Sequence, residues 1–251
     1  MKEISLQTSI IYGPVTSRRF GKSLGINLLP VDRRLCTFDC IYCQYRDVAG
    51  SKGFPSFSEF YIQATSEFER LRDQGLKPDW IMISGNGEPT MHPEFADVVD
   101  GLRTLRDLHF PDTPVGILSN STTCGKEKIR RAIDKLDGRF MKLDAGNIYT
   151  FHDVNQPSTP FIWDEMVRNL SMLHKISLQS MFVKGRVDNT VERVVDDWIA
   201  TVRKIQPLEV QIYTLDREPQ AEGVLAAAEE TLRHISSKLL DETGIPSTVF
   251  A

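Results

Sequence analysis

Six short apolar runs alternate with longer stretches of helical periodicity along most of the chain, and this order strongly limits the possible folds. Each run spans six to eight residues, which suits a buried strand. Alternating strands and helices are typical of parallel strands joined by crossover helices. The sequence therefore predicts strands at residues 23–30, 79–84, 115–120, 140–145, 177–183 and 208–214.

Two of the intervening segments show the clearest helical pattern. From Pro93 to about Asp107, and from Thr190 to Lys204, apolar residues recur every three or four positions and so share one face. Asn189 or Thr190 is expected to cap the second helix. Gly75, which follows FERLRDQ, is expected to end an earlier helix.

Polar residues inside the predicted strands favour a partly open barrel. In the strand at 208–214, Glu209, Gln211 and Tyr213 alternate with apolar residues, so the polar set shares one face. A parallel strand covered by helices on both faces would be apolar throughout. We therefore expect an α/β fold of the partial (βα)6 barrel type, with a polar lumen. A doubly wound open sheet, in which 208–214 is an exposed edge strand, is the alternative.

A single barrel is expected at residues 23–241, because no Pro/Gly/Ser-rich linker divides the 251 residues. Residues 1–22 are expected to form an N-terminal extension that packs on the barrel. Residues 242–251 are expected to form a C-terminal tail. A short last helix is predicted at about 220–241.

Charge and hydropathy limit the partners. The chain has no apolar run long enough for a membrane span and no signal peptide at its start, so we expect no membrane contact and a cytoplasmic location. A net charge of −4 argues against binding nucleic acid through its phosphates. Local basic pairs remain, among them Arg33 and Arg34. Arg18 and Arg19 lie in a Gly/Pro/Ser-rich segment that a loop could direct toward an anionic group.

Three of the four cysteines lie within eight residues, in CTFDCIYC. In a reducing compartment such a cluster indicates metal ligands rather than disulfides. Cys36, Cys40 and Cys43 follow the first predicted strand, and parallel barrels place their chemistry at this end of the strands. Three thiolates on a [4Fe-4S] cube leave one iron free to bind a small molecule, whereas four would close the site.

A closed site is the main alternative. A structural Zn site of the Cys3His type would need a histidine, and His92 is the nearest one downstream. Cys124, which follows the third predicted strand, would supply a fourth thiolate from the same rim. A lone cysteine is more often a small buried apolar residue, so we prefer the open site.

CTFDCIYC resembles the CxxxCxxC signature of radical S-adenosylmethionine (radical SAM) enzymes, including an aromatic residue, Tyr42, before the last cysteine. That family has a glycine-rich GGE-type segment after its second strand, and this chain has Gly85-Asn86-Gly87-Glu88 there. Three further segments, YGPVTSRRFGKSLGIN, KLDAGN and VQIYTLDREP, resemble the branch of iron-sulfur oxidoreductases related to wybutosine-synthesis enzymes. The family's core is a partial (βα)6 barrel.

The resemblance implies a role for each matching residue. Cys36, Cys40 and Cys43 would bind one [4Fe-4S] cluster, and the GNGE turn would bind the methionine end of S-adenosyl-L-methionine. Asn86 stands where many members have glycine, so the local backbone is expected to differ slightly. Position at or near a strand end makes Asn120, Asp144 and Gln179 further cofactor candidates, and Tyr42 of the cysteine motif is expected near the adenine. The substrate candidates are the lumen residues Lys142, Gln211 and Tyr213, together with Arg18 and Arg19.

The resemblance also implies the reaction. One reduced cluster would cleave S-adenosylmethionine and produce a 5'-deoxyadenosyl radical that abstracts hydrogen from a small-molecule, peptide or protein substrate. A reduced flavodoxin or ferredoxin would supply the electron. Cys124 alone cannot ligate a second cluster, so wybutosine enzymes with two clusters are incomplete matches. The alternative function is a non-catalytic metal-binding module with a closed Fe-S or Zn site.

Overall fold

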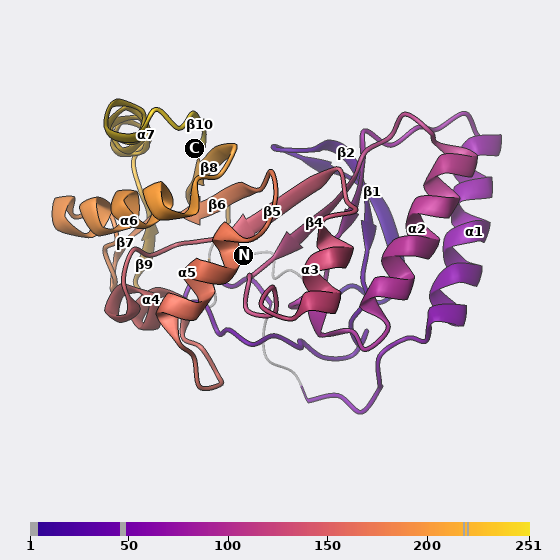
Figure 1. The fold of residues 1–251 in the computed structure, drawn as a ribbon. Coiled ribbons are helices and arrows are strands. Elements are labelled where there is room, and N and C mark those ends of the chain that lie inside the picture. The colour runs from indigo at the N-terminus through magenta and orange to yellow at the C-terminus, as the bar shows by residue number, and fades with distance from the viewer. Residues whose placement is uncertain (1–4, 46–48, 218, 220) are drawn as a thin grey trace.

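The computed structural model describes residues 5–45, 49–217, 219 and 221–251. In this part of the chain one curved sheet has the strand order β1-β2-β3-β4-β5-β6-β8-β10 (Figure 1). The strands are β1 (Ile11–Ser17), β2 (Gly21–Ile26), β3 (Trp80–Ile83), β4 (Val115–Ser119), β5 (Gly138–Lys142), β6 (Ser177–Met181), β8 (Glu209–Tyr213) and β10 (Ser247–Phe250).

The strand order confirms the barrel type. From β2 to β8 the six predicted strands follow one another in parallel without a reversal, whereas a doubly wound sheet reverses its order at a switch point. β8 has β6 on one side and β10 on the other, so it is not an edge strand. Val210 and Ile212 face the main core, while Tyr213 lines a cavity in the lumen, as the alternating pattern predicted.

Helices cover the outer face of the sheet (Figure 1). They are α1 (Phe57–Asp73), α2 (Phe95–His109), α3 (Glu127–Ile133), α4 (Ile148–Asn155), α5 (Trp163–Ser171), α6 (Glu192–Ile205) and α7 (Glu229–Thr243), with a 3-10 turn η1 (Pro89–Met91). The main core lies between the strands and these helices and includes the fully buried Phe60, Phe95 and Trp198. Gly75 lies just past the end of α1, as predicted. Within the described residues no helix combines the length and the apolar character that crossing a membrane requires.

Several predicted boundaries were wrong for identifiable reasons. β2 ends at Ile26 rather than at residue 30, because the Asn27 carboxamide bonds to both backbone groups of Leu29 and turns the chain. β6 ends at Met181, and β7 (Val183–Gly185) pairs with β9 (Val224–Ala226) in a separate two-stranded sheet. α7 begins at Glu229, since β9 occupies part of the predicted helix; Gln220, its predicted start, lies outside the described residues.

The predicted cap of α6 was also wrong. Val191 is the cap residue, and it makes no side-chain capping bond. Asn189 instead donates to the carbonyls of Asp144 and Met181 and accepts from the backbone of Val183. Its carboxamide therefore ties together the ends of two neighbouring strands at the site described below.

The two ends of the sheet approach each other. β1 pairs with β2 in antiparallel orientation, and the turn between them carries Arg18, whose Nη1 donates to the Ala251 carbonyl at 2.8 Å. The same guanidinium lies 3.6 Å from the Asp216 carboxylate, beyond the end of β8. Because β1 and β10 are the two outer strands of the sheet, these contacts link its two edges at the β1–β2 turn.

Candidate active site

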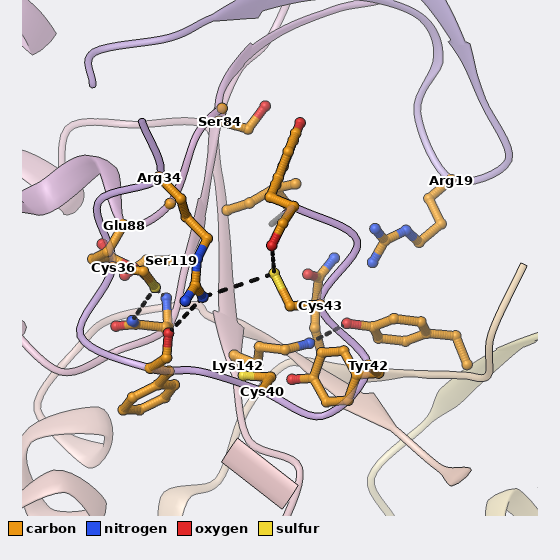
Figure 2. A pocket seen from close by; sticks show the side chains of 18 residues that line it. Arg19, Arg34, Cys36, Cys40, Tyr42, Cys43, Ser84, Glu88, Ser119 and Lys142 are labelled. Atoms are coloured by element: carbon orange, nitrogen blue, oxygen red, sulfur yellow. Dashed lines mark hydrogen bonds between the residues drawn. The ribbon is translucent and has the colours of Figure 1, made fainter. Parts of the chain in front are cut away.

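Cys36, Cys40 and Cys43 line one cavity of about 250 Å³ at the carboxyl ends of the parallel strands (Figure 2). The loop that carries them follows β2 and turns tightly, with the Cys43 amide donating to the Cys40 carbonyl at 2.8 Å. The other lining residues come mainly from the strand ends and from the loops that follow them. The structure thus brings together the three cysteines that the sequence grouped.

A side-chain N–H group lies near each of these three sulfur atoms. Asn120 Nδ2 lies 3.4 Å from Cys36 Sγ, and Asn155 Nδ2 lies 3.4 Å from Cys40 Sγ. Arg34 Nη1 lies 4.0 Å from Cys43 Sγ (Figure 2). The hydrogen bonds from Asn120 to Cys36 and from Asn155 to Cys40 favour the thiolate over the thiol.

Burial opposes that preference in the protein as it stands. It raises the pKa of Cys36 to about 11 and that of Cys40 to about 12, and the carboxylates of Glu88 and Asp144 act in the same direction. Both thiols therefore keep their protons near neutral pH. A bound iron cation would offset the cost of the negative charge, so ligation and proton release are coupled.

This coupling predicts a pH dependence of cluster assembly. Below their raised pKa values, the fraction of Cys36 and Cys40 in the thiolate form increases about tenfold per pH unit. We expect anaerobic iron-sulfur reconstitution, followed by its charge-transfer absorbance, to be at least about tenfold faster at pH 9 than at pH 7. The Cys124→Ala variant should show the same dependence. A rate that does not change with pH would contradict the assignment of these thiols as ligands.

Cys124 and His92 are both engaged away from the cavity. Cys124 is buried, its Sγ donates to the Ser121 carbonyl at 2.9 Å, and it belongs to the main core. The His92 ring bonds through Nε2 to the Pro55 carbonyl and accepts from the Glu94 amide through Nδ1. Both ring nitrogens are thus satisfied, which disfavours a closed four-ligand site.

The glycine turn after β3 packs directly on the cysteine loop. Leu35 donates to the Asn86 carbonyl and accepts from the Glu88 amide at 2.8 and 3.0 Å. Gly87 has φ +140°, and a Cβ there would lie 1.9 Å from the Leu35 carbonyl oxygen. The glycine is therefore required for contact between two protein loops, in addition to any approach to a ligand.

The side chains of Asn86 and Glu88 both make hydrogen bonds to other parts of the protein. The buried Asn86 side chain donates to the carbonyls of Gln7 and Pro30 and does not line the cavity, unlike Gly85, Gly87 and Glu88. The Glu88 carboxylate accepts from Thr90, Ser119 and the Asn120 amide. Burial raises the pKa of Glu88, and these donors oppose the increase. Glu88 joins the glycine turn to the end of β4.

A buried polar network lies below Cys40. Asp144 accepts from the Tyr42 hydroxyl, from Asn155 Nδ2 at 2.6 Å and from the Met181 amide at 2.8 Å. Burial and the Asp144 charge raise the pKa of Tyr42 well above its usual value, so the phenol keeps its proton. Tyr42 lines the cavity, whereas Asp144 supports it from behind.

Most of the remaining candidates lie at the lumen side of the cavity. Lys142, Gln179 and Tyr213 line it, and Asn120 does so beside Cys36. Gln211 does not line it, but it accepts from Gln179 Nε2 at 2.8 Å and so orients that carboxamide. Leu118 also lines the cavity, and it packs against a small apolar cluster that contains Phe20, Met82 and Phe140.

The two adjacent arginines of the β1–β2 turn have different positions. Arg19 lines the cavity, whereas Arg18 points outward to Ala251 and Asp216. Sequence reasoning did not assign Arg34 and Asn155 to the site. Arg34 was visible only as one of a basic pair, and no pattern marks Asn155, which is the last residue of α4.

The donor set fits a [4Fe-4S] cluster held by Cys36, Cys40 and Cys43. Three thiolates of a cube bind three separate irons, while a single ion needs its ligands at one point. In the described part of the chain no three His, Cys, Asp or Glu side chains converge in that way. The N–H group facing each sulfur and the Arg34 cation, whose side chain is only 9 % exposed, match the negative charge that a thiolate-bound cluster carries.

Comparison with known proteins identifies the family of this chain. Residues 33–197, more than half of the chain, match the Radical SAM superfamily. A protein of Brachyspira hyodysenteriae called GTPase Obg is 28 % identical over 253 residues, which cover 96 % of this chain but only 36 % of that protein. This chain thus spans about a third of that relative.

Two further proteins are similar over most of the chain. The S-adenosyl-L-methionine-dependent tRNA 4-demethylwyosine synthase of Pyrococcus abyssi is 23 % identical, over 85 % of this chain and 70 % of that protein. The solved structure of TYW1 with a lysine-pyruvate adduct has a TM-score of 0.67 and 12 % identity, covering 88 % of this chain and 74 % of that one, which shows a shared fold. With its three clustered cysteines and partial barrel, this chain belongs to the radical SAM superfamily and is related to the wybutosine-synthesis enzymes.

Proposed function

We propose that this chain is a single-cluster radical SAM enzyme. The observation that carries the proposal is the cavity that contains three cysteine thiols, with the chain's remaining cysteine, Cys124, bonded elsewhere. When bound and reduced, a [4Fe-4S] cluster supplies the electron that cleaves S-adenosylmethionine to a 5'-deoxyadenosyl radical, which abstracts hydrogen from substrate. The substrate is a small molecule, a peptide or a protein, and a reduced flavodoxin or ferredoxin is the electron donor.

The residues that line the cavity would bind the cluster and S-adenosylmethionine and shield them from solvent. Cys36, Cys40 and Cys43 hold the cluster, and Arg34 stabilises its negative charge. Gly85, Gly87 and Glu88 form the wall beside Cys36, where the methionine end of the cofactor binds. Their carbonyl and N–H groups are available because the glycines carry no side chain.

The hydrogen-bond network around Asp144 supports the wall of the cavity beside Cys40. Tyr42 packs beside Cys40 and is held by Asp144, while Asn120 and Gln179 present carboxamides to the cavity. Leu118 lines the cavity and packs against the buried cluster around Phe20 and Phe140, so this part of the wall is apolar and limits the access of water. Exclusion of water and oxygen is what a reactive radical requires from its protein.

The tRNA that the name of the Pyrococcus relative mentions is not proposed as this chain's substrate. The net charge is −4, and affinity for nucleic acid depends on many Lys and Arg contacts to phosphate. Cys124, which lies in the core, also leaves the chain without the ligands for a second cluster.

Anaerobic reconstitution tests the proposal. We expect about four irons and four sulfides per chain, as a cube requires. We also expect the electron paramagnetic resonance spectrum of the reduced cluster to change when S-adenosylmethionine is added, because one iron is open to it. A bound zinc, or a cluster whose spectrum does not change when S-adenosylmethionine is added, would support the closed metal-binding module instead.

A further inference from the structure

The Arg19 guanidinium has no ion-pair partner among the described residues. It lines the cavity, and its Nη1 is buried without a hydrogen-bond partner among them. No carboxylate of the described residues lies within ion-pair distance of this guanidinium. It rests on aromatic faces instead, 4.6 Å from the centre of the Tyr213 ring and 5.4 Å from that of Phe20. Burying a charged donor without a hydrogen-bond partner costs free energy. An anionic ligand that accepts from Arg19 Nη1 would offset this cost.

Lys142 adds a second positive charge on the same wall. Its Nζ lies 5.0 Å from the centre of the Tyr213 ring, so the two cations share that ring from Arg19 and from β5. Burial opposes its charge, but the Asp144 carboxylate, 3.5 Å away, raises the pKa of Lys142 above its usual range. The Lys142 ammonium also donates to the Tyr213 hydroxyl, which holds it beside the ring that Arg19 covers.

These cations lie away from the glycine turn. In Figure 2 the Arg19 guanidinium points into the cavity from the side opposite to Glu88, with Cys43 between the two. The methionine end of the cofactor is assigned to the glycine turn. Arg19 therefore lies across the cavity from the residues that would bind the methionine end of the cofactor.

We propose that Arg19, with Lys142 beside it, binds a carboxylate or phosphate group of a small anionic substrate. This inference rests on the proposed function, because it assigns the substrate class of the same cavity. Planar guanidinium groups bind oxyanions in bidentate fashion, and Tyr213 holds the Arg19 plane in place. The anion fixes the substrate next to the cysteine loop, where the radical is produced.

Binding of probe anions to the reconstituted full chain tests this assignment. Malonate and inorganic phosphate are titrated separately by isothermal calorimetry, so that the two sources of an oxyanion are distinguished. We expect one of them to bind the wild-type chain and to bind Arg19→Gln about 30-fold or more weakly, the effect of truncating one partner of a buried charge pair. Arg19→Lys keeps the positive charge but loses the bidentate guanidinium group, so its affinity for the anion should be intermediate.

Arg18→Gln is the matched control. It removes the same charge from the same turn, but its side chain points away from the cavity, so anion binding should stay at the wild-type level. The inference is overturned if neither anion binds the wild-type chain, or if Arg19→Gln binds the anion as well as wild type.

A third titration separates the substrate from the cofactor. If Arg19→Gln weakens S-adenosylmethionine binding by the same factor as anion binding, Arg19 serves the cofactor and the inference is wrong. Failure of the proposed function has a different signature. In that case the wild-type chain itself would lack the cluster spectrum and its response to S-adenosylmethionine, whatever residue stands at position 19.

Discussion

Replacing Cys40 by alanine is expected to abolish cluster binding. Cys40 is one of three thiols in the cavity, and removing it leaves a cube with two protein ligands. Loss of an outer partner of a metal ligand typically lowers affinity 10- to 100-fold, and loss of the ligand itself exceeds this. Iron content, sulfide content and the charge-transfer absorbance of the reconstituted Cys40→Ala chain should all fall close to background.

Cys124→Ala is the matched control for this experiment. It removes a thiol of the same kind, but one that is buried in the main core and bonded to Ser121. We expect full cluster content and a decrease of only about 1 kcal/mol in the free energy of unfolding. Loss of iron from Cys124→Ala, or its retention in Cys40→Ala, would refute the ligand assignment.

Replacing Gly87 by alanine should have the second large effect. The new methyl group would lie 1.9 Å from the Leu35 carbonyl oxygen and 3.2 Å from Cys36 Cβ, in a backbone conformation with φ +140°. Strain and overpacking together correspond to roughly 2–5 kcal/mol. We expect a matching decrease in unfolding free energy, and because the displaced atoms belong to the cysteine loop, we also expect lower cluster content.

Gly53→Ala provides the comparison for this substitution. Apart from Gly53 and its two chain neighbours, no heavy atom of the described residues lies within 4 Å of the position that a Cβ would take there, so alanine should change neither stability nor iron content measurably. Chemical denaturation and iron analysis of both variants test the prediction. If Gly87→Ala is as stable as Gly53→Ala, the contact between the glycine turn and the cysteine loop does not have the role assigned to it.

Features encoded by short stretches of sequence could be predicted. The three cysteines are grouped by their own spacing, and the six parallel strands by apolar runs separated by helical periods. The position of Tyr213 on the cavity side of β8 followed from alternation inside that strand. In each case, the residues that decide the outcome lie within one element or one loop.

Features that depend on distant contacts could not be predicted. Arg18 and Arg19 are neighbours in one segment, and only the approach of the sheet's two edges sends one to Ala251 and the other into the cavity. Asn155 lies 115 residues from Cys40 in the sequence, and the fold alone brings its amide to that sulfur. Residues 242–251 were expected to form a tail, but they contain the strand β10. A strand of four residues gives almost no periodic signal in the sequence.

Asn86 shows what a motif leaves open about a single side chain. Its position in GNGE implied a cofactor contact through the backbone of the turn, and its carboxamide bonds to Gln7 and Pro30. Ordinary polar residues within a glycine turn can face either the ligand or the protein. Only the tertiary partners decide between the two, and here they lie in the N-terminal segment and in the loop after β2.

The most direct test of the account is product analysis after one-electron reduction. The anaerobically reconstituted chain is mixed with S-adenosylmethionine and a strong chemical reductant, and 5'-deoxyadenosine and methionine are quantified. The account predicts that both products form in equal amounts, that Cys124→Ala retains this reaction and that Cys40→Ala lacks it. Intact S-adenosylmethionine beside a fully assembled and reduced cluster would contradict the central claim.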